Sequence, residues 1–404
     1  MNKNILHLDL DTFFVSCERL IDSRLQKRPL LVGGTGDRGV VAACSYETRR
    51  FGVHSGMPMR LAKRLCPEAV VIRGNSSIYT KYSHQVTEII KEKVPIFEKA
   101  SVDEFYADLT GMDTFFGSYK YASELRSMII KETGLPISFG LSSNKIVSKV
   151  ATGEAKPNNQ LRIDPGFEKP FLAPLSIRKI PSVGDKTYQI LRNLGIDKVH
   201  VVQQMPVEMM TSVLGVNGTT IWKRANGLDN PPLIPFHERK SISTERTFNK
   251  DTTDVVKLRT TIFAMAENLS FQLRRGDKLA SCISVKIRYS DFNTYSKQLK
   301  IPYTSADHVI IPKILELFDN LYQRRLLIRL VGVKFSDLVT GNYQINLFDD
   351  TEAMLNLYHA MDTIRNRYGE LSIQKASSMG AKTIGRFQNP FNGEPPVLLA
   401  HRKY

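Results

Sequence analysis

The 404-residue chain has few cysteines and no long apolar run. The cysteines are scattered without a CxxC pair, so their spacing predicts neither a disulfide framework nor a zinc site. No segment approaches the length of a membrane span, and the N-terminus lacks the basic and then apolar pattern of a signal peptide. We therefore expect a cytoplasmic protein with no membrane association. Four residues are expected to be small buried hydrophobes: Cys17, Cys44, Cys66 and Cys282.

Acidic residues are the other group in short supply. The chain has 40 Asp and Glu against 56 Lys and Arg, which gives a net charge of +16 and a pI near 9.6. A basic balance of this size favours a polyanionic partner such as nucleic acid. The alternative is a basic surface that serves only solubility.

Internal repeats and low-complexity runs are absent too, and the composition is that of a globular protein. Strand-like and helical segments alternate at first, short helices with Gly and Pro follow, and the proline-rich "NPPLIPFHERK" predicts a linker. The length allows several domains. We expect an α+β multidomain fold with five parts: 1–166, 167–234, a linker at 235–240, 241–340 and a tail at 341–404.

Residues 241–340 have the order strand, helix, two strands, helix, strand. Apolar residues from Val255 to Leu273 recur three and four apart and predict one buried helical stripe. The economical interpretation is a four-stranded sheet covered by two helices. In "CISVKIRY", apolar residues alternate with polar ones that include Lys286 and Arg288, so the other face meets either solvent or DNA.

The first strand carries acids that need an explanation. Residues 5–10 alternate and predict a strand with one buried face, yet Asp9 and Asp11 are costly there. Either this is an exposed edge strand, or its end holds a cation. "ASVDEFYADLTG" predicts a β-hairpin whose bend carries Asp103 and Glu104. If these two acids converge with Asp9, their carboxylates repel one another unless a cation such as Mg²⁺ neutralises them. Two such ions would serve an in-line phosphoryl displacement.

Three further segments suit phosphate binding. "SYETRRFGVHSGMP" predicts a short helix capped by Ser45, with Tyr46 and Arg49 on one face. Lys156 ends a helix just before a proline and could serve as a point charge for phosphate. "KIPSVGDKT" predicts a tight turn between helices, whose backbone N–H groups and Lys186 fit a nucleic-acid backbone. Solvated surface residues and an ordinary structural turn are the alternatives.

Several stretches, in order along the chain, resemble the Y-family translesion DNA polymerases of the bacterial DinB type. They are "HLDLDTFFVSCE", "SYETRRFGVHSGMPMRLAKRLCP", "FEKASVDEFYADLTG", "FGLSSNKIVSKVATGEAKPN", "IPSVG" and "ERTF". The resemblance implies a right-hand polymerase in four domains. These would be a palm and fingers at 1–166, with the fingers at approximately 20–75, a thumb with a helix-hairpin-helix at 167–234, and a little finger at 241–340.

The resemblance also implies roles for single residues. Two Mg²⁺ ions would be held by Asp9, Asp103, Glu104 and the carbonyl of Leu10. The nucleotide would contact Phe13, Phe14, Tyr46, Arg49 and Lys156. The gate that excludes a ribose 2′-OH would be Phe14, and Asp11 would be structural. The candidate DNA contacts are Ser182, Gly184, Lys186, Lys286 and Arg288.

The stretch "QINLF" at 344–348 resembles the bacterial sliding-clamp-binding pentapeptide. Gln344, Leu347 and Phe348 would anchor it to the β subunit of the clamp. Residues 349–404 depart from the DinB pattern and are similar to the C-terminus of the UmuC branch. They leave open a contact with an accessory protein.

We therefore expect a monomeric, low-fidelity, template-directed DNA polymerase that adds dNTPs to a primer 3′-OH. Two rivals come from other classes. A non-catalytic DNA- and clamp-binding factor on this fold would be marked by a missing metal carboxylate. Another two-metal enzyme, such as a nucleotide cyclase, would need neither "KIPSVG" nor "QINLF".

Overall fold

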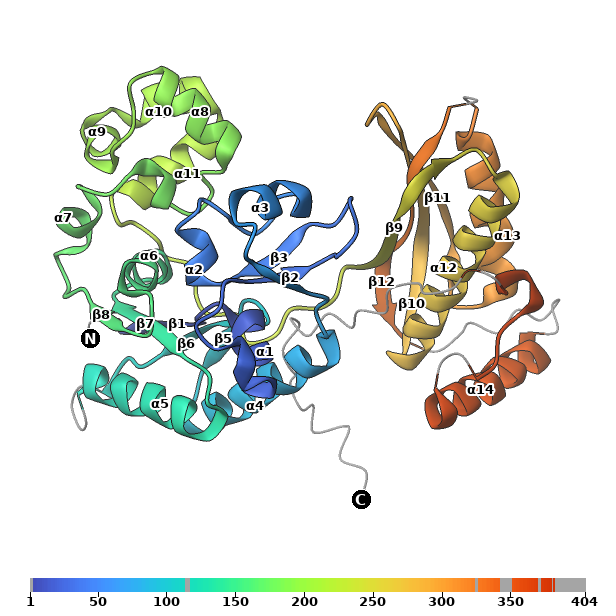
Figure 1. The fold of residues 1–404 in the computed structure, drawn as a ribbon, viewed down its shortest axis with the longest axis horizontal. Helices are drawn as coiled ribbons and strands as arrows, with labels where there is room; N and C mark the ends of the chain where they lie inside the picture. The colour runs from blue at the N-terminus through green and yellow to red at the C-terminus, as the bar shows by residue number, and fades with distance from the viewer. Residues whose placement is uncertain are drawn as a thin grey trace. The chain divides into compact units, whose positions relative to one another are not determined.

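The computed structural model describes residues 3–112, 117–323, 326–341, 351–369, 372–379 and 381. The chain forms two compact units, which meet along the chain between His237 and Glu238. This boundary falls within 235–240, where the proline-rich sequence predicts a linker. Each unit has a sheet with helices packed on it (Figure 1).

A five-stranded sheet with the order β5-β6-β1-β7-β8 is the centre of the first unit. The strands are β1 (Ile5–Leu10), β5 (Phe97–Lys99), β6 (Glu104–Asp108), β7 (Ile137–Ser142) and β8 (Gln160–Arg162). Strand β1 lies in the middle and pairs antiparallel with β6 and β7. Helix α6 (Lys145–Ala155) covers one face, while α4 (Ser76–Lys93) and α5 (Ser118–Thr133) lie on the other (Figure 1).

Strand β1 is buried on both faces, so the prediction of a single buried face is wrong, and so is the exposed-edge alternative. Leu6 and Leu8 belong to the apolar core of the unit. His7 points to the opposite face, where its Nδ1 is hydrogen-bonded to Thr152 Oγ1 of α6 at 2.8 Å. Alternation along this strand separates two buried environments, because α6 covers the face that carries the polar residues.

A small sheet and a group of short helices complete the first unit. Strand β2 (Leu30–Gly33) lies between β3 (Val41–Cys44) and β4 (Val70–Ile72). The remaining helices are α1 (Phe13–Ile21), α2 (Tyr46–Arg49), α3 (Met59–Leu65), α7 (Glu168–Leu172), α8 (Asp185–Asn193), α9 (Val199–Gln204), α10 (Val207–Leu214) and α11 (Val216–Ala225). Helices α7 to α11 share an apolar core with α6.

The second unit contains a four-stranded antiparallel sheet with the order β11-β10-β12-β9. Its elements are β9 (Ser241–Thr252), α12 (Val255–Arg275), β10 (Lys278–Tyr289), β11 (Thr294–Thr304), α13 (Asp307–Leu321), β12 (Ile328–Thr340) and α14 (Thr351–Tyr368). Helices α12 and α13 cover one face of the sheet (Figure 1) and enclose an apolar core. The predicted four-stranded sheet with two helices is confirmed, and with it the α+β fold.

Helix α14 lies within the stretch predicted as a tail, 341–404, and it buries polar side chains against α12. Arg365 Nη2 donates to Glu267 Oε1 at 2.7 Å. Asp362 Oδ2 accepts from Arg274 Nε at 2.6 Å, and Arg274 Nη1 donates to Asp307 Oδ1 at 2.8 Å. No side chain in this network is more than 11% exposed. These buried ion pairs make α14 part of the second unit.

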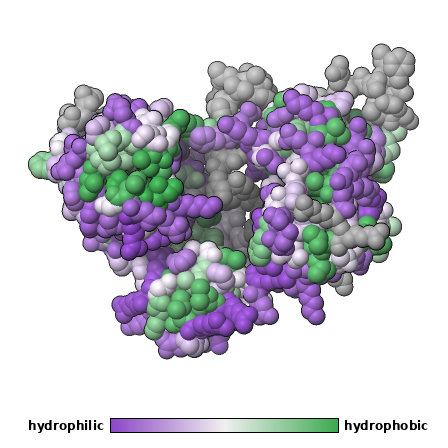
Figure 2. Space-filling model, turned by 90° about the horizontal axis from the view of Figure 1, so that it is seen from above, coloured by the Kyte–Doolittle hydropathy of each residue, from purple (hydrophilic) through white to green (hydrophobic). Residues whose placement is uncertain are grey.

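The predicted clamp peptide, with Gln344, Leu347 and Phe348, lies outside the described residues. Within the described ranges, no helix is long and apolar enough to span a membrane. The face shown in Figure 2 is mostly hydrophilic, and its hydrophobic residues gather in separate patches.

The four cysteines are free thiols and all are buried. Cys17, Cys44 and Cys66 lie in the first unit, and Cys282 lies on β10 of the second. The interpretation of the cysteines as small buried hydrophobes is confirmed.

Candidate active site and a polar sheet face

Two neighbouring strands bring the predicted carboxylates together. Asp9, near the end of β1, pairs in register with Glu104, the first residue of β6. Asp103 precedes Glu104 in the turn after β5, and because β5 and β6 are antiparallel, the predicted hairpin is confirmed. The Leu10 N–H donates to the carbonyl oxygen of Asp103 at 3.0 Å. This bond fixes the acid-bearing turn beside the end of β1.

Ser101, which sequence reasoning missed, organises that turn. Its hydroxyl donates to Asp103 Oδ1 at 2.5 Å and accepts from the backbone N–H of Glu104 at 3.0 Å. Burial raises the pKa of Asp103, the Ser101 hydroxyl opposes that rise, and the neighbouring Glu104 adds to it. The sequence does carry a sign of this role, because a serine two residues before an aspartate is typical of turns in which the side chain binds the backbone.

Lysines lie against two of the three carboxylates. Lys156 Nζ is 2.5 Å from Asp9 Oδ1, and Lys149 Nζ is 2.6 Å from Glu104 Oε2. Lys149 belongs to α6 and Lys156 immediately follows it, so both approach the site from one helix. Burial raises the pKa of Asp9 to about 7 although Lys156 acts against this, and Glu104 and Asp103 raise it further. The site therefore favours positive charge near Asp9.

In the described part of the chain, no group of three or more His, Cys, Asp or Glu side chains is arranged to hold a metal ion. The donor chemistry still fits one. Asp9, Asp103 and Glu104 supply carboxylate oxygens and Leu10 a main-chain carbonyl, the ligand types that hard divalent cations take. Crowded, buried carboxylates also gain from neutralisation by a cation.

Asp11 has the structural role interpreted from the sequence. It is 1% exposed, and its Oδ2 accepts from Ser138 Oγ at 2.9 Å and from the Asn158 N–H at 2.5 Å. Tyr46 donates its hydroxyl to Asp11 Oδ1 at 3.4 Å. Asp11 thus ties β7, the segment after α6, and α2 to the end of β1.

The predicted pair on α2 lies next to this network. Ser45 Oγ accepts from the Thr48 N–H at 3.4 Å, which confirms Ser45 as the cap of the helix. The Arg49 guanidinium lies over the Tyr46 ring, 5.1 Å from its centroid. Burial raises the pKa of Tyr46, so its hydroxyl stays a neutral donor. Tyr46 and Arg49 are therefore joined to the carboxylate region through Asp11.

Helix α1 begins three residues after Leu10 and carries Phe13 and Phe14. Phe13 is buried, whereas Phe14 is partly exposed. The Phe14 ring stacks on Tyr79 of α4, and Tyr79 donates a 2.5 Å hydrogen bond to Glu18 of α1. Sequence reasoning missed Tyr79 because it lies 65 residues from Phe14 and no local pattern joins the two.

The predicted phosphate-binding turn lies before α8. Ser182, at φ 81°, and Gly184, the residue before α8, are exposed, as is Lys186. Arg224 of α11, which the sequence analysis did not single out, donates to the Pro181 carbonyl at 2.9 Å and also to Ser182 Oγ. The turn is thus held by a guanidinium from the last helix of the group.

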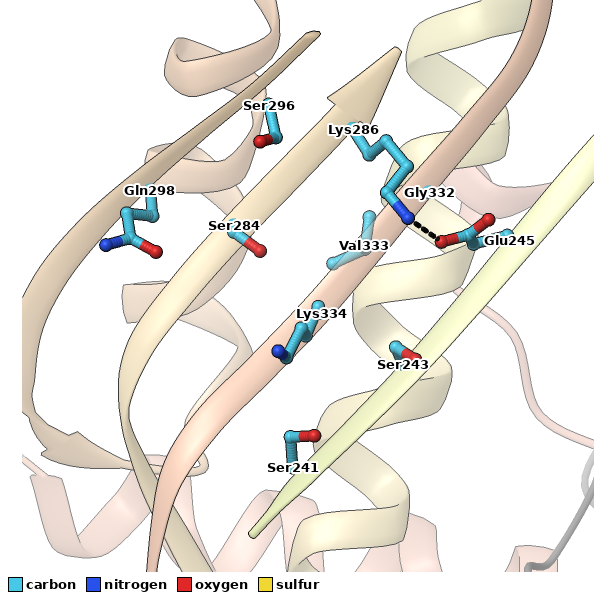
Figure 3. Close-up of a pocket in the computed structure, with 10 residues that line it drawn as sticks. All are labelled: Ser241, Ser243, Glu245, Ser284, Lys286, Ser296, Gln298, Gly332, Val333 and Lys334. Atoms are coloured by element: carbon cyan, nitrogen blue, oxygen red, sulfur yellow. Dashed lines mark hydrogen bonds and ion pairs between the residues drawn. The ribbon is translucent and has the colours of Figure 1, made fainter. Parts of the chain in front are cut away.

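The second unit carries a polar groove on the sheet face opposite α12 and α13 (Figure 3). The groove has a volume of about 490 Å³. Lys286 of β10 lines it, on the sheet face away from the helices where the alternation in "CISVKIRY" puts it. Arg288 donates to Thr294 Oγ1 at 2.8 Å farther along the same strand. The lining residues are Ser241, Ser243, Glu245, Ser284, Lys286, Ser296, Gln298, Gly332, Val333 and Lys334.

Comparison with known proteins gives matches over most of the chain. Residues 8–153 match the impB/mucB/samB family, and residues 239–347 match its C-terminal domain. DNA polymerase IV of Dehalococcoides mccartyi (strain CBDB1) is 37% identical over 386 residues, which cover 95% of this chain and 99% of the relative. DNA polymerase IV of Treponema denticola is 32% identical, with 95% of each chain covered.

The fold is also similar to that of a solved structure. A Y-family DNA polymerase chimera of Dbh and Dpo4 superposes with a TM-score of 0.73 at 25% identity. The match covers 84% of this chain and 100% of the chimera.

Proposed function

Because the chain belongs to the impB/mucB/samB family of Y-family DNA polymerases, we propose that Asp9, Asp103 and Glu104 are its catalytic metal-binding residues. The chain is a DNA-directed DNA polymerase of the translesion type, which acts on template-primer DNA and dNTPs and depends on divalent metal. The observation that supports the assignment most is the register of Asp9 with Glu104, beside the Asp103 turn.

The metal is Mg²⁺, two ions per site, with the Leu10 carbonyl as a further ligand. When bound, these ions supply charge neutralisation for the attack of the primer 3′-OH on the α-phosphate. Lys156 pairs with Asp9 and lies 3.7 Å from Asp11 Oδ1. Its ammonium also suits the phosphates of a nucleotide. With a nucleotide bound, the Lys156 ammonium would contact the triphosphate in place of the Asp9 carboxylate.

The nucleotide pocket is formed by Phe13, Phe14, Tyr46, Arg49 and Lys156. Tyr46 offers a neutral hydroxyl and Arg49 a planar set of donors, which suits phosphate oxygens. Phe14 is the steric gate, because its ring is partly exposed and is held in place by Tyr79. An aromatic edge at that position would meet a ribose 2′-OH but leave room for a deoxyribose.

Two surfaces bind the DNA backbone without reading sequence. The turn at Ser182, Gly184 and Lys186 supplies backbone N–H groups and a lysine. The sheet face with Lys286 and Arg288 supplies cations and hydroxyls. In this assignment 1–166 is the palm with the fingers, 167–234 the thumb, 235–240 the linker and 241–340 the little finger.

Gln344, Leu347 and Phe348 attach the polymerase to the β subunit of the sliding clamp, and residues 349–404 leave open a contact with an accessory protein. The enzyme acts as a cytoplasmic monomer. The support is the match of "QINLF" to the clamp-binding pentapeptide and its place in the sequence shortly after β12, the last strand of the four-stranded sheet.

Primer extension by the full chain tests the catalytic assignment. Wild-type protein with Mg²⁺ and one dNTP at a time should extend a primer by the templated base. Asp103→Asn should bind the same DNA with unchanged affinity and add nothing. Extension by Asp103→Asn at the wild-type rate would overturn the metal assignment, and binding without extension by the wild type would favour the non-catalytic alternative.

A further inference from the structure

A single row of residues crosses the polar sheet face of the second unit. Gly332 of β12 pairs in register with Glu245 of β9 on one side and with Lys286 of β10 on the other. Figure 3 shows the Glu245 carboxylate and the Lys286 ammonium meeting over Gly332, where an ion pair joins Nζ to Oε1. An acid and a base on next-but-one strands thus contact each other across a strand that lacks a side chain.

Gly332 is what allows this contact. A Cβ atom at position 332 would lie 2.8 Å from Glu245 Cγ, which is closer than carbon atoms approach without contact repulsion. The backbone of Gly332 has no left-handed conformation, so the missing side chain accounts for the glycine. Any larger residue at position 332 would displace the Glu245 side chain and disturb its ion pair with Lys286.

The next row of the groove differs in its charge. Lys334 follows Gly332 by two residues on the same face of β12, with Ser243 and Ser284 as its register partners. Among the described residues, no acid is ion-paired with Lys334, whereas Lys286 is paired. The groove therefore holds one ammonium that is free for a ligand and one whose charge a carboxylate cancels.

We infer that Glu245 acts as a built-in competitor for DNA phosphate at Lys286, so that Lys334 is the principal cation of this groove. The inference rests on the proposed DNA-binding role of the sheet face. A neutral pair displaces no counterion from DNA, while each lysine that neutralises a phosphate steepens the dependence of log K on log salt by about 0.9. Glu245 thereby limits how tightly and how salt-dependently the sheet holds DNA.

Equilibrium binding of primed duplex DNA by the full chain, over a range of KCl concentrations, tests this inference. Glu245→Gln should tighten binding several-fold and steepen the salt slope by about 0.9. Adding Lys286→Met to Glu245→Gln should remove that gain. Lys334→Met should weaken DNA binding and flatten the salt slope by about 0.9. Its loss of DNA affinity should exceed the loss caused by Lys286→Met alone.

Two controls separate charge from position. Asp319→Asn removes an equal charge from α13, on the covered face of the sheet, where Asp319 pairs with Arg259; it should leave the salt slope unchanged. Gly332→Ala keeps both charges but displaces the Glu245 side chain, so it should reproduce part of the gain of Glu245→Gln.

Equal losses of DNA affinity in Lys286→Met and Lys334→Met would overturn the inference, because Lys286 would then already neutralise a phosphate in the wild type. So would a Glu245→Gln variant with wild-type affinity and slope. If Lys334→Met and every other groove variant bind as the wild type does, the sheet is not a DNA-binding face, and the proposed role of the groove fails with it. Failure of the catalytic proposal would appear separately, in the Asp103→Asn extension assay.

Discussion

The ring of Phe14 stacks on the ring of Tyr79, with 4.3 Å between centroids and 14° between planes. Tyr79 is itself fixed, since its hydroxyl donates to the carboxylate of Glu18, which is 9% exposed. Phe14 and Glu18 are four residues apart on α1, so Tyr79 of α4 contacts two residues on one side of that helix. The proposed sugar gate is thereby held from behind by a second aromatic ring.

Replacing Tyr79 should weaken sugar discrimination. Tyr79→Ala removes a stacking partner worth about 1 kcal/mol, so we expect ribonucleotide rejection to fall by about fivefold, less than in Phe14→Ala. Tyr79→Phe keeps the stack but loses the hydrogen bond to Glu18, and it should stay near wild type. Single-nucleotide insertion with paired dNTP and rNTP measures the ratio. Unchanged discrimination in Tyr79→Ala would show that Phe14 holds its position alone.

Lys149 should tune the metal dependence of the site. Lys149→Met removes the ammonium 2.6 Å from Glu104, so repulsion of an incoming cation falls while Glu104 loses the contact that orients it. We expect half-maximal rate at a lower Mg²⁺ concentration together with a lower kcat, and Lys149→Arg should restore both. A Mg²⁺ titration of the extension rate tests this. A variant that only melts at a lower temperature, with its metal dependence intact, would assign Lys149 a structural role alone.

The polar face of α14 should make the C-terminal extension necessary for the second unit. A chain that ends at residue 348 leaves Arg274 and Glu267 buried without their α14 partners Asp362 and Arg365, and breaking such pairs costs about 3 kcal/mol or more. Calorimetry should show the unit melting at a lower temperature. A chain that ends at residue 381 retains α14 and is the matched control. Equal melting temperatures for the two truncations would contradict this expectation.

Lys99 of β5 should lower stability at neutral pH. Burial lowers the pKa of Lys99 to about 8 from an ordinary value of 10.5, and Glu88 opposes only part of that change. Between pH 8 and pH 10.5 the unfolded chain binds more protons than the folded one, so the free energy of unfolding rises with pH in this range. Below pH 8 the folded protein bears the full cost of burying the charged Lys99.

Lys99→Met should therefore remove a penalty of about 3 kcal/mol at pH 7 and lose a hydrogen bond worth about 1 kcal/mol. The free energy of unfolding should rise by about 2 kcal/mol, and this gain should shrink toward pH 10. The variant also loses the 2.8 Å bond to Thr87 Oγ1, which makes Thr87→Val the natural control. Urea unfolding at several pH values gives the comparison. A constant difference between Lys99→Met and wild type across that range would contradict the assignment.

The sequence allowed the acids and the hairpin to be predicted because their signals are local. Asp103 and Glu104 are adjacent in the sequence, and the Ser45 hydroxyl accepts a hydrogen bond from the N–H of Thr48, only three residues away. The pairing of Asp9 with Glu104 joins residues 95 positions apart. The chemistry of the residues made their convergence a hypothesis, and the likeness to known polymerases turned it into a prediction.

Other features could not be predicted because distant elements decide them. Alternation in β1 indicated one solvated face, but α6 covers that face and supplies Thr152 to His7. Helix α14 buries the polar side chains Asp362 and Arg365 because they pair with Arg274 and Glu267 of α12, which lie far away in the sequence. Gly332 gives no signal in the sequence, since its meaning depends on Glu245 and Lys286 on the strands to either side.

The reactivity of the four buried thiols reports how often the structure around each of them opens. None is more than 5% exposed, so a thiol reagent can modify a cysteine only after the surrounding structure opens. Cys17, Cys44 and Cys66 report on the first unit and Cys282 on the second. Mass spectrometry of a chain labelled for increasing times would therefore give the opening rate of each unit within one unmodified protein, with no reporter added.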